Sequence, residues 1–311
     1  MVDTVRETSP FDIQTTFTVQ ERDQEKQSFD DIKSTVNDVI LLLPRRPHGA
    51  IGTEFLEALK RKRDAYRALR SAFALERKGQ TLSRAKVQLL SELGISTLNV
   101  PESSSVIMSE LLDCYYSTYR LIQDTDPLKV RRDESQDLGY IQLGAEANGK
   151  FNNFFFGLHN RHKLSEAELE KIFEIAFDKA GLTEDLKSRA LGFREGVIAS
   201  LKGYLYLVKT LPGYQVAQAD QDTDLNWGVD LIASKENYSN VYQVKSKKAG
   251  PLSCIEITRL EQVEEVRKSI VLSEEPRSRR WLRSLYRMYE YASGLNAKGR
   301  NARAFYLQVP L

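Results

Sequence analysis

The sequence predicts an α/β protein in which a mainly helical N-terminal region precedes a central mixed sheet flanked by helices. Two neighbouring runs, 229–233 and 241–245, alternate in side-chain character from residue to residue and are rich in β-branched and aromatic residues, as strands are. The polar, turn-prone break at 234–240 predicts that the two runs form a hairpin. Most of the chain before residue 124 instead repeats apolar residues at helical spacing.

After a polar segment over residues 1–30, helices are predicted at 29–43, 53–78, 82–93 and 105–123. The second helix has a basic face on which Lys60 and Arg63 lie. Clustered cations supply most non-specific affinity for nucleic acid, so these two residues are candidate phosphate contacts. A solvated face neutralised by neighbouring acids is the alternative. In the fourth helix, Tyr115, Tyr116 and Tyr119 could stack on bases, but their helical spacing favours a place in the core.

The middle of the chain holds several glycines and a phenylalanine-rich run. We predict a short strand and a loop between Gly139 and Gly157. The domain boundary is placed there, and it separates a mainly helical region, 1–150, from a second region, 151–311. The first region is predicted to serve substrate recognition or dimerisation. A helix at 165–180 should begin with a capping box.

Helices and strands alternate beyond residue 182. Helices are predicted at 183–210, 257–271 and 276–294, and strands at 214–219 and 304–309 in addition to the hairpin. An acidic stretch, 220–224, stands just before the hairpin. Asp222 or Asp224 could bind a metal ion or aim this loop at a site, while a solvated acidic turn is the favoured alternative.

Asp230, Gln243 and Lys245 are the candidate catalytic residues of the hairpin. Because side chains alternate along a strand, Gln243 and Lys245 leave the same side of the sheet, and Asp230 is expected near the middle of the neighbouring strand. Carboxylate and amide oxygens suit Mg²⁺, which usually needs only one or two protein carboxylates. A nearby lysine can orient or deprotonate water and offset the charge of a phosphate. A chance arrangement in an ordinary hairpin is the alternative.

The run Gly-Val-Asp-Leu that contains Asp230, followed by Gln-Val-Lys at 243–245, resembles the core motif of the PD-(D/E)XK nuclease superfamily. The resemblance implies a restriction-endonuclease-like core over residues 183–311. It also implies that Asp230 binds the metal, that Gln243 binds it partly through its backbone carbonyl, and that Lys245 assists the water. Two positions depart from the pattern: Val229 stands where the motif has proline, and Gln243 replaces an acidic residue.

Glu195 is the candidate for the negative charge that Gln243 lacks. It lies on or beside the apolar stripe of the helix predicted at 183–210, where a carboxylate is costly unless it is paired or bound to metal. In the resembled fold, the helix before the first core strand often carries a glutamate that joins the metal site. A solvated glutamate at the edge of the helix is the alternative.

The C-terminal segment has the most lopsided charge of the chain. Residues 276–311 contain eight Lys and Arg against one acid, Glu290. A basic surface beside an acidic pocket suits a phosphodiester, so nucleic-acid contacts are predicted for Lys247, Arg277, Arg279, Arg280 and Arg283. The alternative is an exposed amphipathic helix whose apolar residues enter the core.

Composition bounds the remaining possibilities. The net charge is only +2, so a nucleic-acid surface must come from the distribution of charge. Two distant cysteines, Cys114 and Cys254, fit a reducing compartment and give no zinc cluster. His159 and His162 could share a helical face, but without cysteines nearby a polar contact is favoured over metal ligation. The longest early apolar run is too short to span a bilayer, so we expect a soluble cytoplasmic protein outside membranes.

These observations predict a Mg²⁺-dependent endonuclease that hydrolyses DNA and is of restriction or resolvase type, with Mn²⁺ expected to substitute for Mg²⁺. The sequence has no Gly-x-x-x-x-Gly-Lys-Ser/Thr loop, which argues against a built-in NTP-driven motor. A homodimer would present one active site to each of the two DNA strands. The alternatives are an RNA- or structure-selective nuclease, and a nucleic-acid-binding protein with the same fold and no chemistry, which the neutral Gln243 keeps open.

Overall fold

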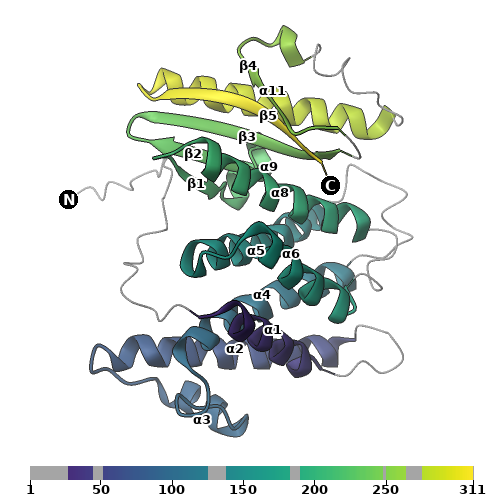
Figure 1. Ribbon diagram of the computed structural model, residues 1–311. Helices are drawn as coiled ribbons and strands as arrows, with labels where there is room; N and C mark the ends of the chain where they lie inside the picture. Colours follow the sequence, from purple (N-terminus) through teal and green to yellow (C-terminus); the bar gives the residue numbers. More distant parts are fainter. Residues whose placement is uncertain are drawn as a thin grey trace, which may run out of the picture.

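The computed structural model describes residues 27–44, 52–124, 138–182, 190–247, 250–263 and 275–310. Within these ranges, the side chains of 124, 138–141, 190–192 and 275–282 are not described. Most of the polar segment predicted at 1–30 therefore lies outside the described residues. The described elements form successive layers, from α2 at one end of the molecule, through α4, α5 and α8, to a sheet that α11 covers on its far side (Figure 1).

The described residues before α8 form helices joined by turns, with no strand among them, in agreement with the mainly helical N-terminal region that the sequence predicts. These are α1 (Phe29–Leu42), α2 (Thr53–Glu76), α3 (Arg84–Glu92), α4 (Glu102–Asp124), α5 (Leu138–His162), α6 (Glu166–Glu174) and the π-helical turn η2 (Ile175–Lys179). Ser165 and Glu168 form the capping box that the sequence predicts at the start of α6. A second capping box, from Ser28 and Asp31, begins α1.

The strand and loop predicted between Gly139 and Gly157 are wrong, because α5 runs through this segment without a break. The glycines suggested an interruption, but Phe151, Phe154 and Phe155 lie on the buried side of one helix, and their burial outweighs the low helix propensity of glycine. The boundary predicted near residue 150 consequently falls inside α5.

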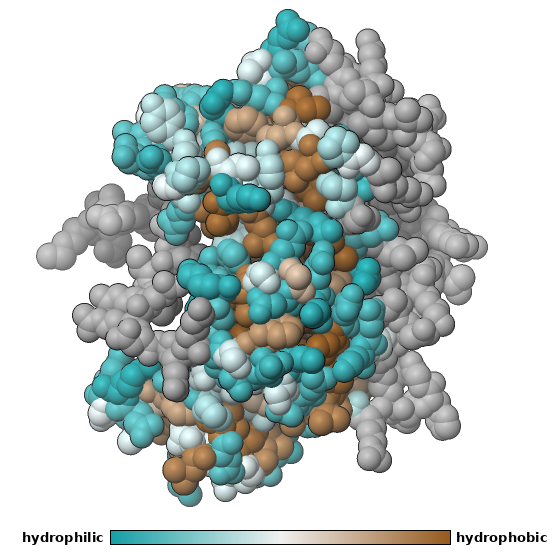
Figure 2. Space-filling model, in the orientation of Figure 1, coloured by the Kyte–Doolittle hydropathy of each residue, from teal (hydrophilic) through white to brown (hydrophobic). Residues whose placement is uncertain are grey.

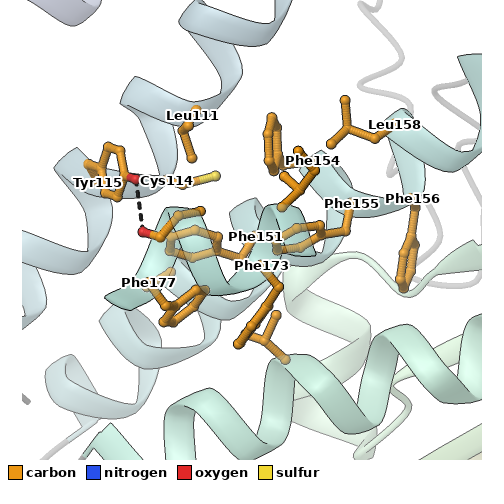
Figure 3. Close-up of a cluster of buried hydrophobic side chains, with 14 of the residues drawn as sticks. Leu111, Cys114, Tyr115, Phe151, Phe154, Phe155, Phe156, Leu158, Phe173 and Phe177 are labelled. Carbon is orange, nitrogen blue, oxygen red and sulfur yellow. Dashed lines mark hydrogen bonds between the residues drawn. The ribbon is translucent and has the colours of Figure 1, made fainter. Parts of the chain in front are cut away.

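An aromatic cluster joins α4, α5, α6 and η2 in the core (Figure 3). The ring of Phe177 lies 4.6 Å from that of Phe151 and 4.2 Å from that of Phe173, measured between centroids. Tyr115 donates a hydrogen bond of 2.8 Å to the carbonyl of Ala176. Tyr115 and Tyr119 are fully buried, so their assignment to the core is confirmed, whereas Tyr116 is half-buried against the Arg63 guanidinium.

The sheet contains five strands in the order β1-β2-β3-β5-β4. Its elements, with the helices around them, are α8 (Ala190–Thr210), β1 (Gln215–Gln218), α9 (Gln221–Trp227), β2 (Leu231–Lys235), β3 (Tyr238–Lys247), β4 (Ser253–Ile257), α11 (Glu275–Ala297) and β5 (Asn301–Pro310). The pair β3–β5 is parallel and the other pairs are antiparallel, which confirms a mixed sheet and the α/β class.

The two faces of the sheet belong to different parts of the core. Tyr242, Val244 and Leu307 pack on the side of α8, in the large cluster that continues to α1. Val241 and Tyr306, from the alternate positions of β3 and β5, pack on the side of α11 in a second cluster. The sheet thus lies between α8 and α11 (Figure 1).

Two elements differ from the sequence predictions. Ile257 ends strand β4 instead of beginning a helix, and most of the helix predicted at 257–271 lies outside the described residues. The acidic stretch 220–224 is no turn, because it forms most of α9. Both elements depend on contacts with residues far along the chain: β4 pairs with β5, and α9 packs against α11.

No helix within the described residues is long and apolar enough to cross a membrane. Figure 2 shows hydrophilic and hydrophobic residues interspersed over the described part of one face.

Candidate active site

Asp230 is fixed opposite Gln243 by its own backbone and side chain. It lies directly before β2, whose first residue, Leu231, pairs with Tyr242 of β3. The Asp230 N–H donates to the Tyr242 carbonyl at 2.8 Å, and its Oδ2 accepts a hydrogen bond from the Val244 N–H at 2.6 Å. These two bonds flank Gln243, so the predicted hairpin places Asp230 beside it, at the end of the strand and not near its middle.

Lys245 completes the arrangement predicted from the strand alternation. Its Nζ lies 3.9 Å from Asp230 Oδ2. The Lys245 side chain is 42% exposed and the Asp230 side chain 22%, so the pair lies at the rim of the sheet with access to solvent. A carboxylate and an ammonium group therefore share one partly shielded site.

Helix α9 brings a second carboxylate to this site. Asp220 caps the helix by accepting from the N–H and the hydroxyl of Thr223, at 2.9 and 2.8 Å. The helix ends at Gly228 in the left-handed conformation, and the chain then enters Asp230. Of the other two aspartates of α9, Asp222 is exposed and Asp224 is half-buried. The sequence made Asp222 and Asp224 equal candidates for metal binding, whereas the helix exposes the first and partly buries the second.

The electrostatics of Asp224 and Asp230 are coupled. Burial raises the pKa of Asp224 from its ordinary value of 3.8 to about 7, the negative charges of Asp230 and Asp220 raise this pKa too, and Lys245 lowers it. Burial also raises the pKa of Asp230, against the Lys245 charge and the Val244 hydrogen bond, which both favour the carboxylate. A cation would relieve the cost of holding two negative charges here.

Gln243 offers a further oxygen. It is 2% exposed, and its Oε1 is buried without a hydrogen-bond partner among the described residues. Such an oxygen is costly unless a donor or a cation meets it. Two carboxylates and an amide oxygen are the hard ligands that Mg²⁺ prefers, so this donor set fits the metal. Within the described chain no group of three or more His, Cys, Asp or Glu could hold a metal ion, so the set depends on Gln243.

Glu195 lies half-buried on α8, where it lines a cleft of about 420 Å³ between α6 and α8. The cleft has an apolar floor that includes Phe173 and Leu201, and Glu170 on its rim pairs with Lys202 at 3.3 Å. The charges that shift the pKa of Asp224 are those of Asp230, Lys245 and Asp220, and Glu195 is not among them. The metal role of Glu195 stays a prediction.

The basic face of α2 is engaged in contacts within the molecule. Arg63 Nη2 lies 2.8 Å from Asp64 Oδ1, and the Arg63 guanidinium stacks 3.9 Å from the centre of the Tyr116 ring. Lys60 lies 3.9 Å from Glu57. These pairs match the solvated and neutralised face that the sequence left as an alternative, and phosphate contacts by Lys60 and Arg63 stay predictions.

Of the cations predicted near the hairpin, Lys247 and Arg283 are described, and they lie toward the same end of the sheet as Asp230. Asn296, near the end of α11, bonds to Ala302 at the start of β5, while Ser284 lies against Gly228. The first turns of α11 therefore extend beyond the site, and the exposed Arg283 belongs to them. The side chains of Arg277, Arg279 and Arg280 lie outside the described part of the structure, although their backbone is helical.

His159 and His162 lie at the end of α5. The Nδ1 of His159 is 2.9 Å from the Leu164 carbonyl, which ties the end of the helix to the following loop. His162 is buried, with 4% of its surface exposed. The structure thus gives His159 a structural contact.

No protein-family model, curated protein or solved structure matches this chain. The resemblance to the PD-(D/E)XK nucleases consequently depends on the few residues of the hairpin motif.

Proposed function

We propose that the protein is a Mg²⁺-dependent endonuclease that hydrolyses phosphodiester bonds of DNA. The observation that carries this proposal is the 3.9 Å separation of Lys245 Nζ and Asp230 Oδ2, at a rim that solvent reaches. The buried oxygen of Gln243 and the perturbed carboxyl of Asp224 support it. Asp230, Asp224 and Gln243 would hold the ion, and Glu195 stays proposed as a further ligand. Mn²⁺ should substitute for Mg²⁺.

The residues have separate parts in the reaction. When bound, Mg²⁺ supplies positive charge to the phosphate and to the leaving oxygen. Lys245 orients the attacking water by hydrogen bonding and offsets the charge that develops on the phosphate. The Val244 N–H holds the Asp230 carboxylate in a fixed orientation. Water adds to phosphorus and gives up one proton, the bond from phosphorus to one bridging oxygen breaks, and the departing oxygen takes up a proton, so the products are a phosphate monoester and a hydroxyl.

Plasmid cleavage with Mg²⁺ tests the proposal. Asp230→Ala and Lys245→Ala should each lose about 100-fold or more of the cutting rate. Asp222→Ala is a matched control, because Asp222 lies on the same helix as Asp224 but is exposed. Circular dichroism and thermal unfolding establish that the variants fold. Equal cutting by all four proteins would remove the assignment.

The substrate and the assembly are separate parts of the proposal. Cleavage rates on duplex, branched and single-stranded DNA and on RNA distinguish the DNA endonuclease from an RNA- or structure-selective enzyme. A homodimer would present two sites to a duplex, and light scattering in the presence and absence of DNA measures the assembly.

A nucleic-acid-binding protein without activity is the second candidate. The neutral Gln243 favours it, because an amide in place of a carboxylate reduces the negative charge beside Asp230. Manganese titration separates the two candidates. In an inactive site, wild type should bind Mn²⁺ no better than Asp230→Ala does.

A further inference from the structure

A row of polar side chains crosses the sheet beside Lys245. The register pairs Lys245 of β3 with Gln308 of β5, and Gln308 with Ser253 of β4, so all three side chains leave the same face. Lys247 leaves this face too, because it follows Lys245 by two residues. We call Lys247, Ser253 and Gln308 the polar row.

The members of the polar row are joined by hydrogen bonds. Lys247 Nζ donates to Ser253 Oγ at 3.4 Å, and Ser253 Oγ donates to Gln308 Oε1 at 3.1 Å. Gln308 Nε2 donates to the Tyr306 hydroxyl at 3.5 Å. An ammonium group has three donors and a carboxamide has two, so Lys247 and Gln308 keep donors beyond these long bonds. All three members are half-buried, so solvent or a ligand reaches them.

The polar row replaces apolar packing at one end of this face. Further along the same strands, the corresponding positions are Val241, Ala304 and Ile257, which are buried against α11. The nearest acid on β4, Glu256, belongs to the opposite face and forms a bidentate pair with Arg303. The row therefore offers donors and a positive charge without a carboxylate among its members.

We propose that the polar row binds a phosphate of the nucleic-acid backbone a few nucleotides away from the scissile phosphate, and so guides the nucleic-acid strand from Asp230 across β5 to β4. This inference rests on the proposed function. Three strand spacings separate β2 from β4, which is about 14 Å. Successive nucleotides of a duplex strand advance by about 3.4 Å along the axis, so the distance exceeds one nucleotide. Lysine, hydroxyl and amide donors are typical of such contacts, which position the strand and read no sequence.

Binding of a fluorescent 20-base-pair duplex, measured by anisotropy in Ca²⁺ at several salt concentrations, tests the row. Lys247→Ala should weaken binding about tenfold and reduce the slope of log affinity against log salt by about 0.9, the value of one phosphate contact. Ser253→Ala should weaken binding about threefold with the slope unchanged, because a neutral donor releases no counterion. Lys247→Arg should restore the slope.

Lys235→Ala is the matched control, because Lys235 is exposed at the opposite end of the same hairpin. It should bind as wild type does. Wild-type affinity and slope in Lys247→Ala would overturn the inference, and so would an equal loss in Lys235→Ala, which would indicate non-specific attraction. The proposed function fails separately, if plasmid cutting survives in Asp230→Ala. Thermal unfolding of each variant ensures that a loss of binding reflects the surface.

Discussion

The carboxylate of Asp230 accepts a 2.6 Å hydrogen bond from the backbone N–H of Val244, between the two other catalytic candidates of β3. A side chain that is hydrogen-bonded to the backbone of a strand is held in one orientation. The bond therefore fixes the carboxylate beside Gln243 and Lys245 before any ligand binds, and such preorganisation favours catalysis. Asp230 loses part of its accepting capacity to this bond but keeps its second oxygen.

Asp230→Asn should separate charge from position. The asparagine Oδ1 can still accept from the Val244 N–H, so stability should change little, while the loss of charge should weaken Mn²⁺ binding about 10- to 100-fold. Isothermal titration with Mn²⁺ and urea unfolding measure the two effects. Unchanged Mn²⁺ affinity would show that the ion, if it binds, does not use this carboxylate.

Stability should depend on pH through Asp224. Its pKa is raised from 3.8 to about 7, so the folded state binds a proton more tightly than the unfolded state does. The stabilisation by that proton is present below pH 4 and is lost as the pH rises through 7. From pH 5 to pH 8, wild type should therefore lose more stability than Asp224→Asn does. The difference between the two losses should be about 1–2 kcal/mol, after allowance for solvent screening. Urea unfolding of both proteins at the two pH values measures this difference.

Magnesium should reverse the cost of that charge. At pH 8, above the pKa of Asp224, bound Mg²⁺ should raise the melting temperature of wild type, because an ion that binds the folded state stabilises it. Asp224→Asn should lose more of this shift than Glu195→Gln, since the charge of Asp224 is coupled to Asp230. A larger loss in Glu195→Gln would assign the second carboxylate to α8 instead.

The hairpin could be predicted because its information is local. The alternation of 229–233 and 241–245 and a polar break between them are enough to predict the hairpin that brings Lys245 to Asp230. Two details were wrong: Asp230 lies directly before its strand and not near its middle, and the turn is shorter than predicted, since it consists of Glu236 and Asn237 alone.

The burial of Asp224 could not be predicted, because it depends on residues far along the chain. The α9 helix ends where Gly228 meets Ser284 of α11. The ring centroid of Trp227 lies 5.7 Å from that of Tyr291, which also belongs to α11. Without that packing, three aspartates at alternate positions indicate a solvated turn. Strand β4 escaped prediction for the same reason, since its partner β5 follows some fifty residues later.

Gln243→Leu should distinguish a ligand from a structural glutamine. The buried Oε1 is without a partner among the described residues, so its removal should leave stability equal or raise it by up to about 1–3 kcal/mol. Mn²⁺ affinity and plasmid cutting should fall at the same time. Urea unfolding and Mn²⁺ titration measure both quantities. A variant that loses stability and keeps its Mn²⁺ affinity would give Gln243 a purely structural role.

Gly228 should prove to be the residue that holds α9, and with it Asp224, at the site. Its φ of 66° is in the left-handed region, and a Cβ at this position would lie 2.7 Å from Ser284 Cβ and 2.9 Å from the Ser284 carbonyl oxygen. Gly79 has a φ of 63°, and a Cβ added there would meet nothing within 4 Å, so Gly79→Ala isolates the backbone strain. That strain should cost about 1 kcal/mol.

Gly228→Ala should cost more than Gly79→Ala, by about 1–3 kcal/mol, because α11 must move away from the end of α9. It should also lower Mn²⁺ affinity, since Asp224 shifts with the helix, whereas Gly79→Ala should bind Mn²⁺ as wild type does. Urea unfolding and Mn²⁺ titration of the two variants test both expectations. Equal stability losses would mean that α11 yields easily at Ser284, and the position of Asp224 would then depend on the Asp220 cap instead.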